Sequence, residues 1–197
     1  MGTKYTGTFW NKGFKSFETD NKKILIDARL YGLEHGGPGR YVINLIKELE
    51  LIDKTNEYII VLRKKYFDQL NFSSNWSKVL ADYRHYSFSE QVKLPILINK
   101  LMPDLVHFPH FNVPVAYKGK FVVTIHDIIM HKFKGTEATT LPAPLYFLKR
   151  IGYGKVFQKA VFDSEKIIVP SNFVKNELVD YYKINPDKVV VTYEGVN

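Results

Sequence analysis

The stretch KKILIDARLYGLEHGGPGRYVINLIKELELIDKTNEYIIVLR, residues 22–63, begins and ends with short apolar runs. Ile24, Leu25 and Ile26 lie at the centre of the first run, and residues 57–63 form a second run rich in β-branched side chains. Runs of this length and composition are typical of buried β-strands. Their separation matches a βαβ unit, which predicts two parallel strands joined by a helix.

The middle of this stretch predicts that helix, from about Arg40 to Leu51. The apolar residues that recur at helical spacing, and that we expect to face the sheet, are Tyr41, Leu45, Leu49 and Ile52. Residues 35–40, HGGPGR, place three glycines and a proline directly before the helix. A helix N-terminus presents unpaired N–H groups, and glycine lets a ligand come close to the backbone. This combination favours an anion site, and a tight turn without a ligand is the alternative.

The rest of the chain continues the alternation of strands and helices. Further strands are predicted within residues 78–81, 103–108, 120–127, 166–171 and 188–195, and further helices within residues 89–102, 141–164 and 172–184. The strands are continuous apolar runs, so both faces of the sheet should be covered. The predicted fold class is therefore α/β: a Rossmann-like, doubly wound, mostly parallel sheet with helices on both faces.

The amino-acid composition limits the kinds of protein that this chain can be. The 197 residues are 45% hydrophobic, which is enough for one sizeable core. There is no cysteine, which excludes disulfides and thiolate metal sites and is compatible with a reducing compartment. The net charge of +8 favours anionic partners, although lysines spread over solvated helices are the alternative. No apolar run approaches the roughly 20 residues that cross a bilayer.

Residues 1–22 are predicted to be an extension outside the main domain, which spans residues 23–197. The extension is polar and lacks the continuous apolar core of a signal peptide. It carries four aromatic residues, Phe9, Trp10, Phe14 and Phe17. Two interpretations stay open: a flexible segment, or an aromatic contact with a partner or a membrane surface.

The glycines of residues 32–39 do not match two known phosphate-binding patterns. Gly37 and Gly39 provide G-x-G, but the third glycine of the dinucleotide pattern G-x-G-x-x-G would fall on Val42. The pattern G-x-x-x-x-G-K would start at Gly32 and fails because Pro38 follows Gly37. What remains is a glycine-rich turn after the first strand, a position that borders the ligand crevice in doubly wound sheets.

Four histidines, His107, His110, His126 and His131, lie within 25 residues of one another. Their spacing matches no zinc pattern and no thiolate is present, so no metal is expected. His126 follows a buried strand, where α/β folds place their chemistry. An imidazole there can bind a hydroxyl or stabilise negative charge, and a buried histidine satisfied by carbonyl groups is the alternative.

Five motifs occur in order: HGGPGRY, PDLVHFPHFNVP, VVTIHDI, IIVPSNFVKNEL and INPDKVVVTYEGVN. In this order and spacing, residues from about Lys23 to Asn197 resemble the N-terminal half of family 4 glycosyltransferases, which have the GT-B architecture. The resemblance implies two Rossmann-like domains that face each other across a cleft. The N-terminal domain mainly holds the acceptor, and the C-terminal domain holds the nucleotide-sugar donor. It also implies a retaining, hexosyltransferase-type reaction with no metal and no other cofactor.

The resemblance also implies roles for particular residues. The glycine turn, here Gly36, Gly37, Pro38 and Gly39, would approach the diphosphate or sugar of the donor, and His126 would contact the transferred sugar near the reaction centre. Arg40 would either assist with phosphate charge or face solvent. Asp127 is the nearest carboxylate to His126 and is expected to be structural, as is Ser171, which should cap the following helix.

The chain ends at YEGVN, where the linker to the second domain of the family begins. We therefore expect the donor domain to be supplied in cis or in trans, and residues 1–197 alone to turn over no donor. Because many members of the family act on lipid-linked acceptors, the resemblance is compatible with a cytoplasmic protein at an anionic membrane surface. Residues 9–17 and 145–159 combine lysines with aromatic side chains and could bind there.

Two other function classes remain as alternatives. One is a dehydrogenase-like nucleotide-binding module, which the broken glycine pattern disfavours. The other is a non-catalytic Rossmann module that docks on a membrane. Nucleic acid is not an expected partner, because the chain lacks the interleaved aromatic and basic residues of a recognition sheet.

Overall fold

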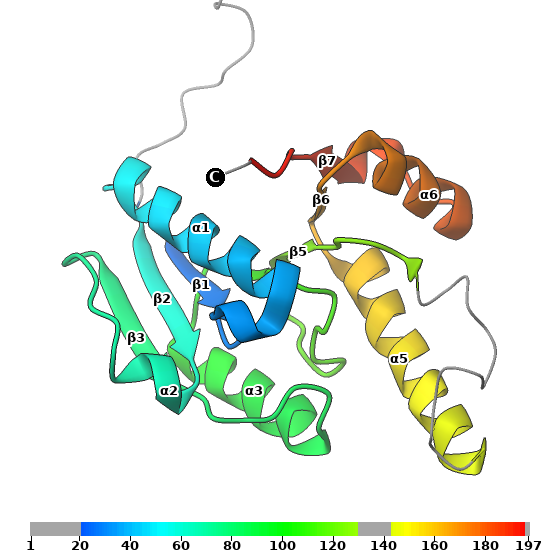
Figure 1. The fold of residues 1–197 in the computed structure, drawn as a ribbon, viewed down its shortest axis with the longest axis horizontal. Helices are drawn as coiled ribbons and strands as arrows, with labels where there is room; N and C mark the ends of the chain where they lie inside the picture. The colour runs from blue at the N-terminus through cyan, green and yellow to red at the C-terminus, as the bar shows by residue number, and fades with distance from the viewer. Residues whose placement is uncertain (1–20, 130–142, 196–197) are drawn as a thin grey trace, which may run out of the picture.

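The computed structural model describes residues 21–129 and 143–195. Seven parallel strands form one sheet in the order β3-β2-β1-β4-β5-β6-β7 (Figure 1). The strands are β1 (Lys23–Asp27), β2 (Glu57–Leu62), β3 (Trp76–Leu80), β4 (Leu105–Phe108), β5 (Phe121–Thr124), β6 (Lys166–Val169) and β7 (Val189–Val191). The predicted parallel α/β sheet is thereby confirmed.

The helices alternate with the strands along the chain. They are α1 (Gly36–Ile52), α2 (Lys64–Phe67), α3 (Phe88–Leu101), α5 (Ala143–Asp163) and α6 (Asn172–Tyr182), with short 3-10 turns at Leu33–His35 and Pro186–Lys188. Every long helix had a counterpart in the sequence pattern. The helix predicted at residue 89 begins at Phe88 instead, because Ser87 is the residue that caps it by accepting the Glu90 N–H.

The strand order reverses at β1 and β4. From β1 the chain moves outward to β2 and β3, and it then returns to β4 and continues outward to β7 on the other side. Ile24 pairs with Leu105, and Ile26 pairs with His107. In open α/β sheets, ligands bind beyond the carboxyl ends of the strands at such a reversal. The segments that follow β1, β4 and β5 are therefore the ones to inspect for a site.

The two faces of the sheet are covered unequally. One face packs against α3, α5 and α6 through a large core that includes Leu94, Phe108, Phe157 and Leu178. The other face carries a smaller core in which α1 covers β1 and β2 (Figure 1). Over β4, β5 and β6, this second face instead lines an open groove with Leu105, His107, Val122 and Ile168.

Helix α1 differs from its prediction in start and orientation. It begins at Gly36, so the glycines form its first turn rather than a loop before it. Val42 and Ile46 are its fully buried large side chains, whereas Tyr41 is half-buried and Ile52 is exposed. The reason is that α1 mainly covers β1 and β2; Tyr41 and Leu49 still pack against the smaller core, as predicted. The ridge with Tyr41, Leu45 and Leu49 borders the uncovered part of the sheet.

Gly39 is required by close packing, and Gly37 is not. A Cβ atom added at Gly39 would lie 1.9 Å from the carbonyl oxygen of Gly32, whereas one at Gly37 would meet nothing within 4 Å. We expect Gly39→Ala to lower the free energy of unfolding by about 2 kcal/mol or more. We expect Gly37→Ala to leave it equal or raise it by up to about 1 kcal/mol, because alanine favours the helix. Urea denaturation of both variants measures the free energies of unfolding. Equal values for the two variants would contradict the close packing of Gly39 against Gly32.

Candidate functional site

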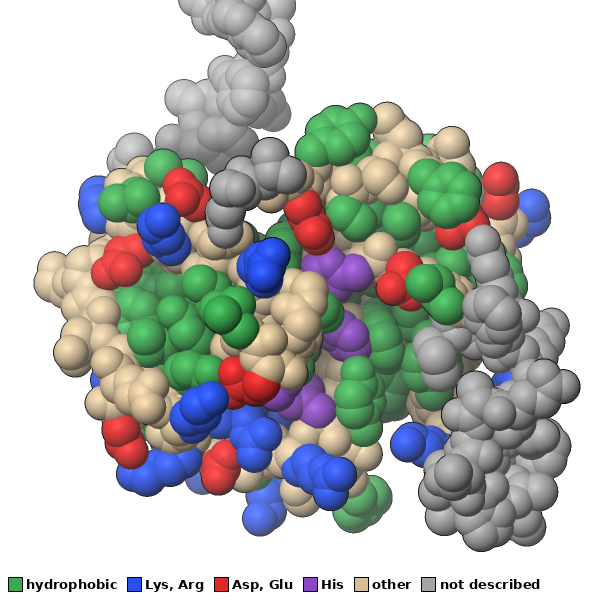
Figure 2. All heavy atoms as spheres, viewed as in Figure 1, with side chains coloured by type: hydrophobic (Ala, Val, Ile, Leu, Met, Phe, Trp, Pro, Cys, Tyr) green, Lys and Arg blue, Asp and Glu red, His purple; other side chains and the backbone are tan. Residues whose placement is uncertain are grey.

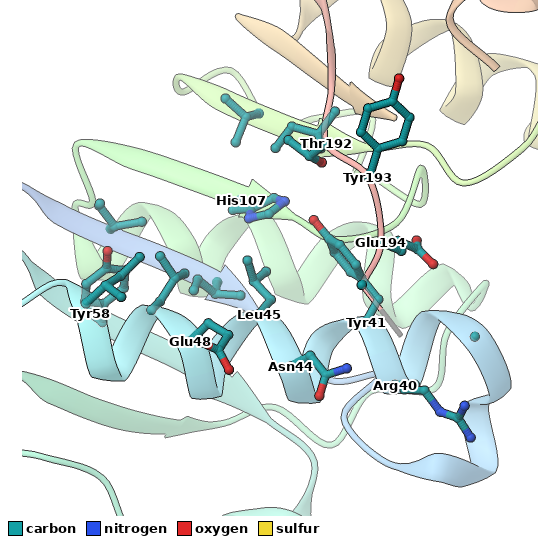
Figure 3. A pocket seen from close by; sticks show the side chains of 18 of the residues that line it. Arg40, Tyr41, Asn44, Leu45, Glu48, Tyr58, His107, Thr192, Tyr193 and Glu194 are labelled. Carbon is teal, nitrogen blue, oxygen red and sulfur yellow. The ribbon is translucent and has the colours of Figure 1, made fainter. Parts of the chain in front are cut away.

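A groove of about 920 Å³ lies between α1, the uncovered face of the sheet and the segment that follows β7. Figure 3 shows Tyr41, Leu45 and Asn44 on the α1 wall, with Tyr193 and Glu194 opposite them. At the carboxyl end of the strands, Gly36, Gly37 and Arg40 line the groove, and toward the other end it becomes apolar. The first turn of α1 is thus part of a concave surface.

The first turn of α1 leaves its backbone accessible. Gly36 adopts a φ of 64°, which favours glycine, and a Cβ atom at Gly36 or Gly37 would point into open space. His35 precedes the helix and gives it no side-chain cap. Pro38 occupies the first turn, where proline is tolerated. Gly36 and Gly37 can therefore receive an anion, while Gly39 is buried against Gly32.

Arg40 borders the groove without pointing into it. Its side chain is exposed, and in Figure 3 it extends from α1 away from His107 and Tyr193. Both roles expected for Arg40 stay predictions, because its side chain is exposed and also belongs to the lining of the groove.

His126 lies two residues beyond β5 and not within the strand, because β5 ends at Thr124. Its Nε2 is 3.1 Å from the carbonyl oxygen of Pro109, and its Nδ1 is 3.1 Å from Oε1 of Glu194. Carbonyl and carboxylate oxygens only accept hydrogen bonds, so Nε2 is the donor in the contact with Pro109 and Nδ1 is the donor in the contact with Glu194. The ring of Tyr41 meets the imidazole edge-on, with 5.0 Å between the ring centroids. These contacts fix the orientation of His126.

Tyr41 also belongs to a chain of polar contacts with two buried side chains. The Tyr41 hydroxyl is 3.0 Å from Oγ1 of Thr124, which in turn is 2.9 Å from Nε2 of His107. Thr124 and His107 lie on neighbouring strands, β5 and β4, and both are buried. Helix α1 is therefore connected through Tyr41 to both strands whose ends carry the site.

Aromatic and imidazole rings continue around the carboxyl edge of the sheet. Successive centroid distances are 5.0 Å for Tyr41–His126, 6.4 Å for His126–His110, 6.2 Å for His110–Tyr86, 6.3 Å for Tyr86–His85 and 6.5 Å for His85–His35. The row begins on α1 and ends at the turn directly before α1. In Figure 2, histidine side chains lie one below another in the hollow at the centre of this face. Rings of this kind can contact the C–H faces and hydroxyls of a sugar.

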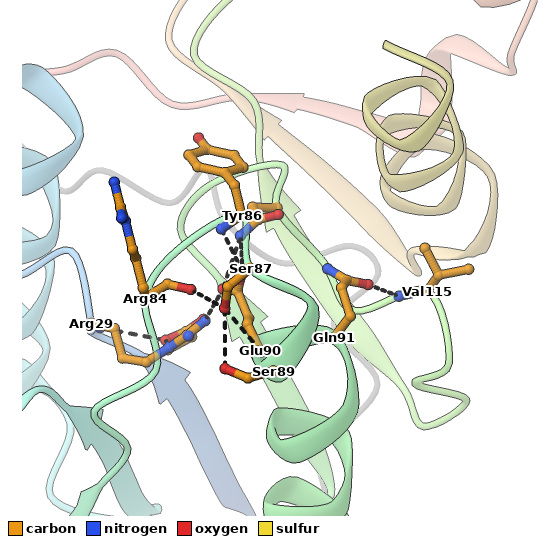
Figure 4. Close-up of polar contacts among 10 residues, drawn as sticks. Arg29, Arg84, Tyr86, Ser87, Ser89, Glu90, Gln91 and Val115 are labelled. Carbon is orange, nitrogen blue, oxygen red and sulfur yellow. Dashed lines mark hydrogen bonds and ion pairs between the residues drawn. The ribbon is translucent and has the colours of Figure 1, made fainter. Parts of the chain in front are cut away.

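Beneath the row lies a buried charged cluster of Asp27, Arg29, Glu90 and Asn112. Arg29 donates to both carboxylate oxygens of Asp27, at 2.7 and 2.6 Å, and to Oε1 of Glu90 at 2.7 Å. The amide of Asn112 lies 2.9 Å from each oxygen of Glu90. Glu90 also accepts the backbone N–H of Tyr86 (Figure 4). One carboxylate thus joins the segments that follow β1 and β4 to the start of α3.

The charges of this cluster depend on one another. Burial works against ionisation, yet the Arg29 guanidinium holds the pKa of Asp27 below its usual value. Burial raises the pKa of Glu90 despite its bonds to Arg29 and Asn112. Two carboxylates hold the pKa of Arg29 above its ordinary value although burial opposes this. Among the described residues, Nη1 of Arg29 has no hydrogen-bond partner.

Three imidazoles are held neutral, which makes stability depend on pH. Burial lowers the pKa of His85 and His107 to about 4 and that of His110 to about 3, from 6.5. Between pH 6.5 and 4 the unfolded chain therefore binds more protons than the folded one. We expect the free energy of unfolding to fall from pH 7 to pH 5 by ~1–2 kcal/mol for each imidazole. Urea denaturation at both pH values measures this.

The variant His107→Gln is the matched control for that experiment, because it removes one titrating group and leaves a polar side chain beside Thr124. Its stability should fall less between pH 7 and pH 5 than that of the unchanged chain. A stability that does not change over this range would contradict the neutral state of the three rings.

The remaining predicted residues lie as follows. Ser171 caps α6 by accepting the Val174 N–H, as expected. Asp127 is exposed and accepts the Ile129 N–H, which is a local structural contact. His131 and residues 9–17 lie outside the described residues. Within residues 21–129 and 143–195, no helix has the length and apolar character needed to span a membrane.

The charged cluster and the Tyr41 chain were not predicted. Asp27 and Arg29 end an apolar run, ILIDAR, and charges that continue a buried strand are a signal that could have been followed. Glu90 lies in the first turn of α3, where a glutamate side chain can bond back to the residue that caps the helix. Instead the side chain turns inward to Arg29. That contact joins residues 61 positions apart, so no local pattern reveals it.

Solved structures that are similar to this chain include a glycosyltransferase, a wall teichoic acid polymerase and a protein in complex with UDP. HepE of Anabaena in complex with UDP has a TM-score of 0.51 at 13% identity, covering 89% of this chain and 44% of HepE. A glycosyltransferase of Rickettsia africae has a TM-score of 0.50 at 21% identity, with 90% and 44% covered. A variant of the wall teichoic acid polymerase TagF has a TM-score of 0.51 at 12% identity, with 86% and 37% covered.

The chain thus spans less than half the length of these three proteins, and at such identities the likeness establishes the fold alone. A comparison with curated proteins finds no match. The model of Glycosyltransferase Family 4 matches residues 35–197, which include the first turn of α1, His126 and the segment after β7. The chain therefore belongs to Glycosyltransferase Family 4.

Proposed function

We propose that this domain forms one wall of the active site of a retaining glycosyltransferase, which moves a hexosyl group from a nucleotide-sugar donor to an acceptor hydroxyl without a metal. The observation that carries the proposal is the convergence of the accessible first turn of α1 with His126. Tyr41 packs on His126 one turn beyond Gly37, and Glu194 both bonds to His126 and lines the groove with Gly36 and Gly37. The UDP bound to HepE supports a nucleotide-linked donor.

The proposed chemistry follows from charge. Transfer through an oxocarbenium-like state leaves growing negative charge on the diphosphate. Backbone N–H groups at Gly36 and Gly37, together with the dipole of α1, stabilise that charge. His126 orients the sugar through Nδ1. Because the Glu194 side chain is 48% exposed, it can turn into solvent and leave Nδ1 to a sugar hydroxyl.

The test is a transfer assay with radiolabelled nucleotide-sugars, comparing the protein encoded by the complete reading frame with residues 1–197 alone. We expect transfer by a protein that carries a second Rossmann-like domain and none by residues 1–197, because the donor-gripping half is then missing. Transfer by residues 1–197 alone would overturn the division of roles. Binding of NAD without any sugar transfer by the complete protein would favour a nucleotide-binding module instead.

A further inference from the structure

Glu194 brings a carboxylate into the part of the groove that the first turn of α1 borders. It lines the groove together with Gly36 and Gly37, and Figure 3 shows it on the segment after β7, near Tyr41. Burial raises the pKa of Tyr41, and the negative charge of Glu194 contributes to this rise. The charge of Glu194 therefore acts on the α1 wall of the groove.

The contacts of His126 give its ring a positive charge. Nε2 donates to the carbonyl oxygen of Pro109 and Nδ1 donates to Oε1 of Glu194, each at 3.1 Å. An imidazole that donates from both nitrogens carries two protons and is cationic. The carboxylate of Glu194 balances that charge, in a place where the His126 side chain is only 17% exposed.

The two rings that also contact His126 are uncharged. Tyr41 from α1 keeps its proton because its pKa is raised, and His110 from the segment after β4 stays neutral because burial lowers its pKa to about 3. Asp127, the next residue in the chain, is exposed and accepts the Ile129 N–H. The contact that compensates the charge of His126 is thus the one with Glu194.

Glu194 is held less firmly than His126. The segment after β7 is joined to the sheet by the Thr192 N–H, which donates to the Val169 carbonyl oxygen at 2.9 Å. The Tyr193 hydroxyl then accepts a hydrogen bond from the Asn172 amide at 3.0 Å. Glu194 follows both contacts, and its side chain is 48% exposed. Rotation of that side chain can move the carboxylate from His126 into solvent while β7 stays in place.

A carboxylate in this position competes with a diphosphate. The first turn of α1 offers N–H groups and the positive end of the helix dipole, and His126 offers a charged N–H. Both border the part of the groove where Glu194 lies. Two negative groups side by side in a partly enclosed site repel each other, so one of them has to leave.

We infer that Glu194 is a positioning residue, which holds His126 charged and oriented toward the groove until a diphosphate-bearing ligand takes the place of its carboxylate. This role rests on the proposed function, since that function brings a diphosphate to the first turn of α1. In the free protein the carboxylate balances the ring. On binding, Glu194 turns into solvent, and Nδ1 donates to an oxygen of the ligand instead.

The variant Glu194→Gln separates orientation from charge. The amide oxygen of glutamine still accepts a hydrogen bond from Nδ1, so the orientation of His126 is kept while the negative charge is lost. The matched control is Glu57→Gln, which removes the same charge from the protein. Glu57 is exposed and begins β2, at the opposite end of the strands from the glycine turn. Circular dichroism checks that both variants are folded.

The experiment titrates the full chain with inorganic pyrophosphate at about pH 6, where an imidazole is readily protonated, and follows the amide signals of Gly36 and Gly37 by NMR. We expect Glu194→Gln to bind pyrophosphate roughly 3–10-fold more tightly than the unchanged chain, because no carboxylate has to leave. Glu57→Gln should bind as the unchanged chain does. In the protein encoded by the complete reading frame, Glu194→Gln should lower the KM for the donor by a similar factor and change kcat less than about two-fold.

Equal or weaker binding of pyrophosphate by Glu194→Gln overturns the inference, and so does equal tightening by Glu57→Gln, because the effect would then be one of net charge. Absence of binding at Gly36 and Gly37 in both the unchanged chain and Glu194→Gln also overturns it. The proposed function fails separately. If the complete protein transferred no sugar while Glu194→Gln still tightened pyrophosphate binding, transfer would be refuted and the role of Glu194 toward a diphosphate would stand. Transfer with a KM that Glu194→Gln leaves unchanged would refute the role of Glu194 alone.

Discussion

Replacement of His126 by alanine in the complete enzyme should lower kcat/KM about 10²–10³-fold, because one oriented hydrogen-bonding group beside a reacting centre contributes on that order. The fold should survive the change. His126 is outside the strand, and its contacts to Pro109, Glu194 and Tyr41 lie at the edge of the sheet rather than in the core. Steady-state kinetics with a saturating acceptor measure the loss, and thermal unfolding confirms that the variant is native.

The control for this prediction is Tyr181→Ala, which removes an exposed ring on α6. Its kcat/KM should stay within two-fold or so of the unchanged enzyme, since surface substitutions away from a site have small effects. A His126→Ala enzyme with undiminished turnover would remove His126 from the reaction. The first turn of α1 would then be the part of the candidate site that still has a proposed role in transfer.

Replacement of Arg29 by methionine should lower the free energy of unfolding by about 3–5 kcal/mol at pH 7. The guanidinium is fully buried and bonds to both Asp27 and Glu90. Methionine fills similar volume but leaves two buried carboxylates near each other without a cation. Loss of a partner from a buried ion cluster costs far more than the cluster itself contributes to stability. Urea denaturation gives the value.

Arg63→Met is the matched control, because Arg63 pairs with Asp82 at the surface, where the two side chains are 37% and 52% exposed. Exposed pairs of this kind contribute ~0–1 kcal/mol. If the Arg29 and Arg63 variants lost equal stability, Arg29 would not hold the cluster together. The triple replacement Asp27→Asn, Arg29→Met and Glu90→Gln should recover part of the loss, since it removes the unpaired charges along with the cation.

The fold could be predicted from the sequence because its elements have strong local signals. Strands such as EYIIVL and KIIV lie in a parallel sheet that is covered on both faces. Their sequences are therefore continuous apolar runs, which are easy to recognise. The orientation of α1 was less predictable. Its apolar residues occupy more than one ridge of the helix. Val42 and Ile46 are the most deeply buried of them because α1 covers β1 and β2. That information is tertiary.

The candidate site was only partly predictable for the same reason. Gly36, Gly37 and His126 are recognisable because each stands next to an element boundary, and the structure brings them to one edge of the sheet. The partners of His126 come from the segments that follow β4 and β7, at separations of 17 and 68 residues. Such partners are set by strand order, which no local pattern contains. The roles of these residues in transfer remain predictions.

The uncovered strip of sheet beside α1 has a practical consequence for work on this chain. A hydrophobic dye such as ANS should find a native binding surface among Leu45, Leu105, Val122 and Ile168. Its fluorescence would then rise with the folded protein, before any denaturant is added. Dye uptake, which is often taken to report a molten or misfolded preparation, would here be a property of well-folded material and would decrease when the groove is filled.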